Sequence, residues 1–262
     1  MPSLDSRGII AVVQVAFYVP VTIITGILVF RYALRRDAGW LFLFIFSLTR
    51  ITDGALIIAG TLTHTTLDLF TPAYTIQAAG IAPLILTSIG FLGLVGQHSF
   101  SETPRISHTL RILGLVTLVA LGIMVAGCLL GSPVNPSKGE VGSILRKVGS
   151  CMFGALYVGV VLVHFGAFSF RWHLRWYRRK LLWGLFLALP FLGARAAYLI
   201  LVTWSSSDLY GTHPSSNHIL ARLNPVTGDF AYYLVLSVVF EFVVTLLYLF
   251  SSTYVMRKHS RS

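Results

Sequence analysis

The chain has 262 residues and a formal net charge of +11, with 55% hydrophobic residues and only 11% charged residues. Soluble domains carry roughly 25% charged residues, so this composition excludes an ordinary soluble fold and indicates that lipid surrounds much of the chain. The positive charge does not indicate a nucleic-acid-binding protein, because the basic residues stand in short segments between apolar stretches. Basic residues in that position are typical topology signals.

Seven apolar stretches are long enough to cross a membrane, since a helix needs about 20 residues to cross a hydrocarbon core of roughly 30 Å. The sequence therefore predicts an all-α, polytopic membrane protein with seven transmembrane helices in one domain over residues 1–262. The predicted spans, in chain order, are Gly8–Phe30, Gly39–Gly60, Ala73–Gly96, Ile112–Gly131, Val148–Phe170, Leu181–Trp204 and Phe230–Val255.

The second predicted span contains two charged residues, Arg50 and Asp53, in the sequence SLTRITDGALI. Residues three apart lie on one face of a helix and can pair. A charge in hydrocarbon is costly, so such residues usually face the interior of a helix bundle and mark a functional site. The third span contains Pro83, which removes a backbone hydrogen bond and tends to kink a helix.

The fourth and fifth predicted spans each carry a cysteine near the loop that joins them, around residues 132–147. Cys128 lies near the end of the fourth span and Cys151 near the start of the fifth. The two thiols could pair in an oxidising compartment, or they could remain two small buried side chains.

The sixth and seventh predicted spans each contain one charged residue, Arg195 in GARAAY and Glu241 in VVFEFVV. Pro190 precedes Arg195 and tends to kink the sixth helix. Between these spans, residues 205–229 form a segment that is long enough to fold over the mouth of the bundle as a lid. It could also be a loose polar connector.

The distribution of Lys and Arg predicts the orientation. With the N-terminus outside or in a lumen, the cytosolic segments carry 13 of the 20 basic residues and the outside segments carry 5. Because cytosolic loops are enriched in Lys and Arg, we expect an outside or lumenal N-terminus and a cytosolic C-terminus. An internal membrane such as the endoplasmic reticulum is the expected location.

The four charged residues of the spans fall in the middle and outer half of the membrane at about 1.5 Å of rise per residue. If the second, sixth and seventh helices are neighbours, Arg50, Asp53, Arg195 and Glu241 form one cluster. One interpretation is a set of buried salt bridges that fix the helix register. The other is that at least one carboxyl group keeps its proton and acts as a general acid. Arginine cannot be that acid, but it can orient a carboxylate or bind an anionic or phenolic group.

The short outside N-terminal segment, RITDG in the second span, GARAAY in the sixth and VFEF in the seventh resemble small fungal seven-helix membrane proteins. Some proteins of this kind are membrane-bound terpene cyclases of meroterpenoid pathways. The resemblance implies cyclisation of a prenyl chain after protonation of an epoxide or a terminal alkene by acids in an early and a late helix. Carried over by position, Asp53 and Glu241 would be the catalytic acids.

The resemblance thus implies a terpene cyclase of fungal secondary metabolism that acts on a lipophilic prenylated molecule taken from the bilayer. Arg50, Arg195, Tyr198 and Phe240 are the expected substrate-binding residues, and aromatic rings would stabilise cationic intermediates. No metal-ligand spacing or Gly-rich phosphate loop occurs, so we expect no metal and no cofactor. The alternatives are a receptor-like or sensor protein that binds a ligand in the outer cavity, and a small transporter.

Overall fold

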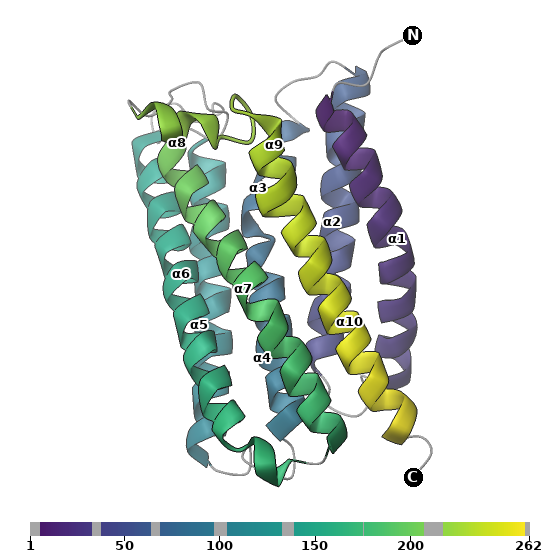
Figure 1. The fold of residues 1–262 in the computed structure, drawn as a ribbon. Helices are drawn as coiled ribbons and strands as arrows, with labels where there is room; N and C mark the ends of the chain where they lie inside the picture. Colours follow the sequence, from purple (N-terminus) through teal and green to yellow (C-terminus); the bar gives the residue numbers. More distant parts are fainter. Residues whose placement is uncertain are drawn as a thin grey trace.

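The computed structural model describes residues 6–32, 38–63, 69–96, 104–132, 139–174, 176–206 and 217–259. Its described residues are helical throughout, apart from short turns, and they include seven spans that are long and apolar enough to cross a membrane. The α-helices are α1 (Ser6–Tyr32), α2 (Ala38–Thr63), α3 (Phe70–Ala79), α4 (Ile81–Gly96), α5 (Pro104–Leu130), α6 (Gly139–Ser169), α7 (Trp176–Ser205), α8 (His218–Arg222), α9 (Phe230–Tyr233) and α10 (Phe240–His259) (Figure 1).

The prediction of seven membrane-spanning helices is confirmed in number, and three helix starts differ by five residues or more. The fourth spanning helix begins at Pro104 rather than Ile112, the fifth at Gly139 rather than Val148, and the sixth at Trp176 rather than Leu181. All three extensions contain basic residues, which an apolarity criterion assigns to loops. A helix continues past the hydrocarbon region wherever its backbone hydrogen bonds and packing allow it, so apolarity marks only the central part of a span.

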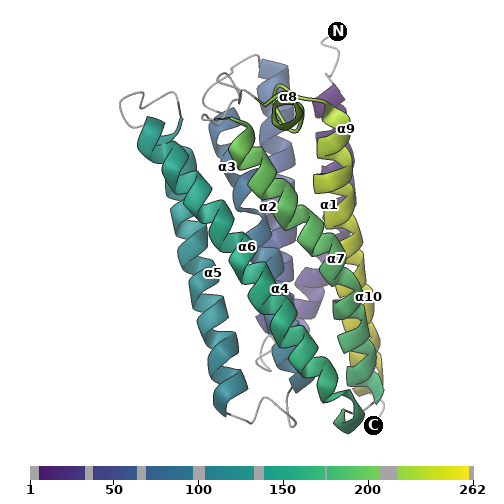
Figure 2. The same cartoon turned by 60° about the vertical axis from the view of Figure 1, so that its left-hand side comes forward.

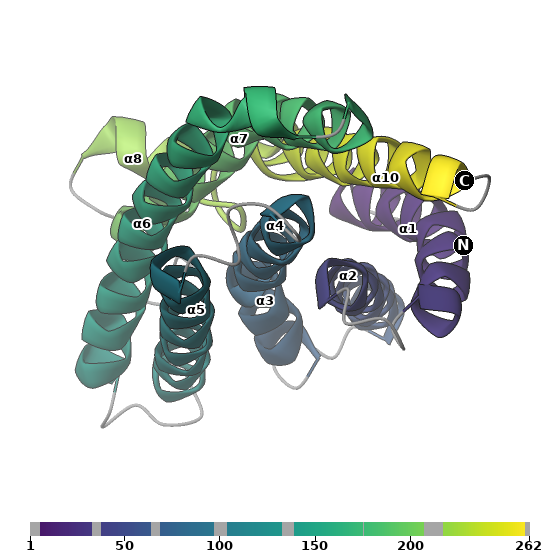
Figure 3. The ribbon, with the colours of Figure 1, turned by 90° about the horizontal axis from the view of Figure 1, so that it is seen from below.

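The third span is the central element of the bundle. In its most apolar stretch 78% of the residues are buried, against 28% to 44% in the other spans. Seen along the bundle, α3 and α4 lie inside an arc formed by α1, α2, α5, α6, α7 and α10 (Figure 3). This span is interrupted at Gly80, where α3 ends and α4 begins. The predicted distortion near Pro83 is therefore a local interruption, because Pro83 has no N–H to donate to the carbonyl of Ala79, while Gly80 itself keeps a right-handed helical conformation.

Glycines allow close helix contacts at both ends of the bundle. A methyl group on Gly90 of α4 would lie 2.7 Å from Cα of Gly39 in α2. A methyl group on Gly142 of α6 would likewise lie 2.5 Å from Cα of Gly131, just after α5. Such small residues let backbones approach closely, which is the usual basis of helix packing in membranes.

Four buried threonine hydroxyl groups inside the spans are satisfied within their own helices. Thr25, Thr87, Thr117 and Thr203 each donate to the carbonyl oxygen four residues earlier, at distances of 2.7 to 2.8 Å. A hydroxyl in hydrocarbon needs such a partner, because no water is available there. Burying these threonines therefore costs little free energy. The charged residues are the more costly polar groups of the interior.

Different elements of the chain lie at the two ends of the bundle. The start of α1, the short helix α8 and α9 lie at one end, which we call the N-terminal end (Figures 1 and 2). The turn between α6 and α7 and the end of α10 lie at the other, the C-terminal end.

Both cysteines are free, Cys128 being buried and Cys151 exposed, so the two thiols are not paired.

The segment 205–229, predicted as a lid or a connector, is anchored where the structure describes it. Residues 207–216 lie outside the described residues, as do residues 133–138 of the other long loop. The side-chain amide of Asn224 donates to the hydroxyl groups of Ser205 and Ser206 at 3.4 and 3.2 Å. Its oxygen accepts the backbone N–H of Val226 at 2.8 Å. Asn224 thus ties the segment after α8 to the end of α7.

Candidate functional site

The first half of the candidate site lies in the middle of α2, where Arg50 and Asp53 are almost completely buried. Because they are one helical turn apart, Nη1 of Arg50 reaches Oδ2 of Asp53 at 3.3 Å. Gln14 of α1 donates to the same Oδ2 at 3.3 Å and to the backbone oxygen of Arg50 at 3.1 Å. Gln14 therefore joins α1 to the charged turn of α2.

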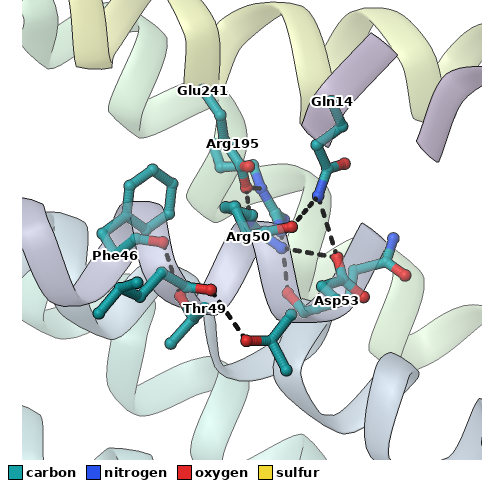
Figure 4. Close-up of polar contacts among 10 residues, drawn as sticks. Gln14, Phe46, Thr49, Arg50, Asp53, Arg195 and Glu241 are labelled. Carbon is teal, nitrogen blue, oxygen red and sulfur yellow. Dashed lines mark hydrogen bonds and ion pairs between the residues drawn. The ribbon is translucent and has the colours of Figure 1, made fainter. Parts of the chain in front are cut away.

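Glu241 of α10 connects this pair to α7. Its Oε1 accepts Nη2 of Arg50 at 2.5 Å and Nε of Arg195 at 2.6 Å. The four residues thus form a continuous series, Asp53, Arg50, Glu241 and Arg195, which we call the ionic chain (Figure 4). Two arginines and two carboxylates give it no net charge, and it links three spans that are distant in sequence.

The break in the third span makes room for the ionic chain. A methyl group on Gly80 would lie 2.8 Å from Cζ of Arg50, so the guanidinium lies directly against the backbone where α3 ends. The last four carbonyl groups of a helix lack partners within it, and Gln77 provides one of them. Its backbone oxygen accepts Nη2 of Arg195 at 3.2 Å.

The backbone just before Glu241 is unusual. Residues Leu234–Val239 form a π-helical segment between α9 and α10. A π-helical turn holds one more residue than an α-helical turn, so it rotates the following side chains around the helix axis, and such turns often occur at functional sites. Here Glu241 follows the segment and is directed into the bundle, where both arginines reach it.

A pocket opens beside the ionic chain toward the N-terminal end. It has about 530 Å³ of empty volume, part of it open to the outside. The lining is mainly apolar, and Arg195 belongs to it. The lining residues are Tyr74, Gln77, Ala78, Met124, Arg146, Arg195, Tyr198, Leu199, Val202, Thr203, Ser206, Asn224, Pro225 and Val226.

Arg195 is shared between the ionic chain and the pocket. Its Nε donates to Glu241 and its Nη2 donates to the oxygen of Gln77. Within the described part of the chain, Nη1 donates to no protein group, and it is not among the nitrogen atoms sealed away without a partner. The two N–H donors of this guanidinium nitrogen therefore have no acceptor within the described part of the chain.

The structure brings together the four charged residues that were predicted for the site. Of the two predicted aromatic residues, one lines the pocket and the other does not. Tyr198 lines the pocket, donates to the backbone oxygen of Leu223 at 3.2 Å, and has its ring centroid 5.9 Å from Cζ of Arg195. Phe240 lies against Phe191 at 5.6 Å between ring centroids and is not part of the described pocket lining. Helix phase separates it from its neighbour Glu241, because adjacent residues on a helix point about 100° apart.

Asp53, Arg50 and Glu241 are not among the described pocket-lining residues either. The three ion pairs correspond to the salt-bridge interpretation of the sequence, in which buried pairs fix the helix register. The catalytic and substrate-binding roles of these residues stay predictions. Among the residues that the structure describes, no group of three or more His, Cys, Asp or Glu side chains could hold a metal ion.

Three residues of the site were missed by the sequence analysis. Gln14 is a lone polar residue in the apolar stretch VVQVAF, a signal that could have identified it, since polar side chains within a span usually face the bundle interior. Arg146 was placed in a loop, yet it is 5% exposed in α6 and lines the pocket. No local sequence pattern could have identified Asn224, because its role depends on contacts with the end of α7.

Comparison with known proteins gives one family. The family model described as "Domain of unknown function (DUF7702)" matches residues 4–258. No curated protein and no solved structure matches the chain. The family description carries neither a source nor an activity, so the resemblance to fungal terpene cyclases stays a prediction.

Proposed function

Because the chain belongs to the DUF7702 family, whose description states no function, we propose a function from the geometry of the site. We infer that the protein is a multi-pass membrane protein of receptor-like type, which binds a small amphipathic molecule in the pocket at its N-terminal end. The observation that carries this proposal is Arg195, which belongs to the pocket lining and whose Nη1 group has no protein acceptor within the described residues.

The lining defines the chemistry of the ligand. An apolar pocket with a few placed polar groups is the usual form of a small-molecule site. Arg195 would donate to a head group that accepts hydrogen bonds, such as a carboxylate, while Leu199 and Val202 would contact an apolar body. The ring of Tyr198 stands beside the guanidinium and limits the directions from which the head group can approach.

The ionic chain supports a binding role more directly than an acid role for Glu241. Its Oε1 accepts two charged donors, and charge-assisted contacts of this kind hold both partners in place. Arg195 is thereby fixed for a ligand rather than free to collapse onto the pocket wall. Preorganised donors increase affinity, because little conformational entropy is lost on binding.

We also propose the orientation of the protein in the membrane. The excess of Lys and Arg in the segments that the sequence assigns to the cytosol, 13 against 5, favours a cytosolic C-terminus and an outer or lumenal N-terminus. The pocket would then open on the non-cytosolic side. An internal membrane such as the endoplasmic reticulum is the proposed location.

Binding can be tested with 11-(dansylamino)undecanoate, a fluorescent anionic amphiphile, and its neutral alcohol analogue, on protein in phosphatidylcholine nanodiscs. We expect saturable binding of the anion. The charge-balanced double variant Arg195→Gln with Glu241→Gln should weaken it about 10- to 150-fold, since hydrogen bonds to a charged group contribute about 1.5–3 kcal/mol. Binding of the alcohol should change much less.

A second variant makes the binding test independent of the ionic chain. Ala78 lines the pocket, so Ala78→Leu should reduce binding of both probes by filling space while leaving the ion pairs in place. Gly93→Ala, where an added methyl group meets nothing within 4 Å, serves as the control. Unchanged binding of the anion in both pocket variants would refute the proposed site.

The predicted terpene cyclase is the second candidate, and one observation favours it. Oδ1 of the fully buried Asp53 accepts no hydrogen bond from any described residue. A carboxyl oxygen without a donor can carry a proton, which could be passed to an epoxide or alkene of a prenylated substrate. Glu241 would then take up the final proton.

Asp53→Asn is the milder test of the cyclase candidate, because it removes one ion pair, whereas Glu241→Gln removes two. We expect Asp53→Asn to be expressed and to abolish product formation in microsomes supplied with a farnesyl-bearing epoxide, while the matched variant Asp229→Asn at an exposed position keeps it. Full turnover by Asp53→Asn, or no consumption of the epoxide by the unchanged protein, would remove this candidate.

A further inference from the structure

The turn between α6 and α7 lies at the C-terminal end of the bundle (Figures 1 and 2). Basic and aromatic side chains gather at this turn. Trp172 is 72% exposed and Trp176 is 43% exposed. Cζ of Arg171 lies 4.5 Å from the ring centroid of Phe168 and 4.9 Å from that of Trp172. Nζ of Lys180 lies 4.7 Å from the ring of Trp176.

The charge of this turn is not balanced by nearby sequence. Residues 171–180 carry five Arg or Lys residues, and no Asp or Glu occurs between Glu140 and Asp208. The stability of α7 does not explain these cations, because Arg178, Arg179 and Lys180 lie near its N-terminal end, where the helix dipole disfavours positive charge. Their placement therefore suits an anionic partner outside the helix.

We propose that this turn is a binding surface for the head groups of anionic phospholipids. Indole rings favour the boundary between lipid chains and water, and Arg and Lys near that boundary are attracted to anionic head groups. The contacts of Arg171 with two rings hold its guanidinium at this boundary, where it can meet a phosphate.

The exposed rings make a bilayer surface, rather than a soluble anion, the fitting partner. Trp183, which lies one helical turn after Lys180 in α7, is 51% exposed and packs edge-on against Phe168 at 5.0 Å between ring centroids. The aromatic side chains thus continue from the charged turn onto the outer face of the spans. A free phosphate would use the cations alone, whereas a lipid uses the cations and the rings together.

The preference can be measured by quenching of tryptophan fluorescence in nanodiscs that contain brominated lipid. Trp40 is buried, and Trp204→Phe removes the exposed indole at the N-terminal end, so the signal comes from Trp172, Trp176 and Trp183. We expect brominated phosphatidylserine to be preferred to brominated phosphatidylcholine by at least about fivefold, the effect of roughly one well-placed cation.

The triple variant Arg171→Gln, Arg179→Gln, Lys180→Gln should reduce this preference to about twofold, since attraction to the anionic surface scales with the number of nearby cations and two of the five remain. The matched control, Lys147→Gln with Arg222→Gln, removes cations at the other end, where Lys147 stands over Trp204, and should keep the preference. Both variants are compared after size-exclusion chromatography shows the same monodisperse peak.

Two results would overturn the proposal. One is an unchanged preference in the triple variant. The other is displacement of the brominated phosphatidylserine by inorganic phosphate at matched ionic strength, which would make the turn a site for a soluble anion. Retention of the lipid in phosphate, together with a reduced preference in the triple variant alone, supports a lipid-binding surface.

Discussion

Replacing Glu241 by glutamine should lower the free energy of unfolding by about 3–5 kcal/mol, the cost of removing one partner from a buried ion pair. The physical reason is that Oε1 of Glu241 accepts both Arg50 and Arg195. Without this carboxylate, two buried guanidinium groups share the single charge of Asp53. Thermal and denaturant unfolding of purified protein in one detergent would measure the loss.

Two comparisons separate the lost charge from other effects of the Glu241 substitution. The double variant Arg195→Gln with Glu241→Gln returns the ionic chain to zero net charge, so it should be more stable than Glu241→Gln alone. Glu140→Gln makes the same chemical change at an exposed position and should stay within about 0.5 kcal/mol of the unchanged protein. Equal stability of Glu241→Gln and Glu140→Gln would show that the ionic chain does not hold the spans together.

Gly80→Ala should destabilise the protein by about 1–3 kcal/mol, the usual cost of overpacking a well-packed interior. The added methyl group would lie 2.8 Å from Cζ of Arg50. The guanidinium is the flexible end of a side chain, but its contacts with Asp53 and Glu241 prevent it from moving away without lengthening an ion pair. The same unfolding measurements apply.

Gly93→Ala is the matched control for Gly80, because it lies in the same span and an added methyl group there meets nothing within 4 Å. Alanine favours a helix over glycine by about 1 kcal/mol, so this variant should be neutral or slightly stabilising. In an Arg50→Ala background, Gly80→Ala should cost less, since the group it would contact is gone. An equal cost in both backgrounds would mean that Gly80 is required for another reason.

The residues of the ionic chain were accessible to prediction because each is a lone charge in an apolar span. Their shared depth could be estimated from the helical rise, and this led to the expectation of one cluster if the helices were neighbours. The pairing between residues of different helices was not accessible. That Glu241 accepts both arginines depends on the π-helical segment before it and on the position of α7 relative to α10.

Phe240 and Arg146 show the limits of arguments from neighbouring sequence. Phe240 was grouped with Glu241 because the two are adjacent, but adjacent residues on a helix point about 100° apart, and Phe240 packs against Phe191 instead. Arg146 was assigned to a loop because it is charged. The fifth spanning helix begins before it and turns its side chain into the pocket.

Apolar length and the spacing of charges were sufficient, from the sequence alone, to establish seven spanning helices and the four charged residues in their interior. Both follow from the cost of placing polar groups in hydrocarbon, which acts on each span separately and so leaves a local record. Only the tertiary structure decided the order of the ionic chain, the break at Gly80 and the pocket beside Arg195. These depend on how helices distant in sequence rotate and pack against one another, and packing among apolar surfaces leaves no periodic trace in a sequence that is apolar on every face.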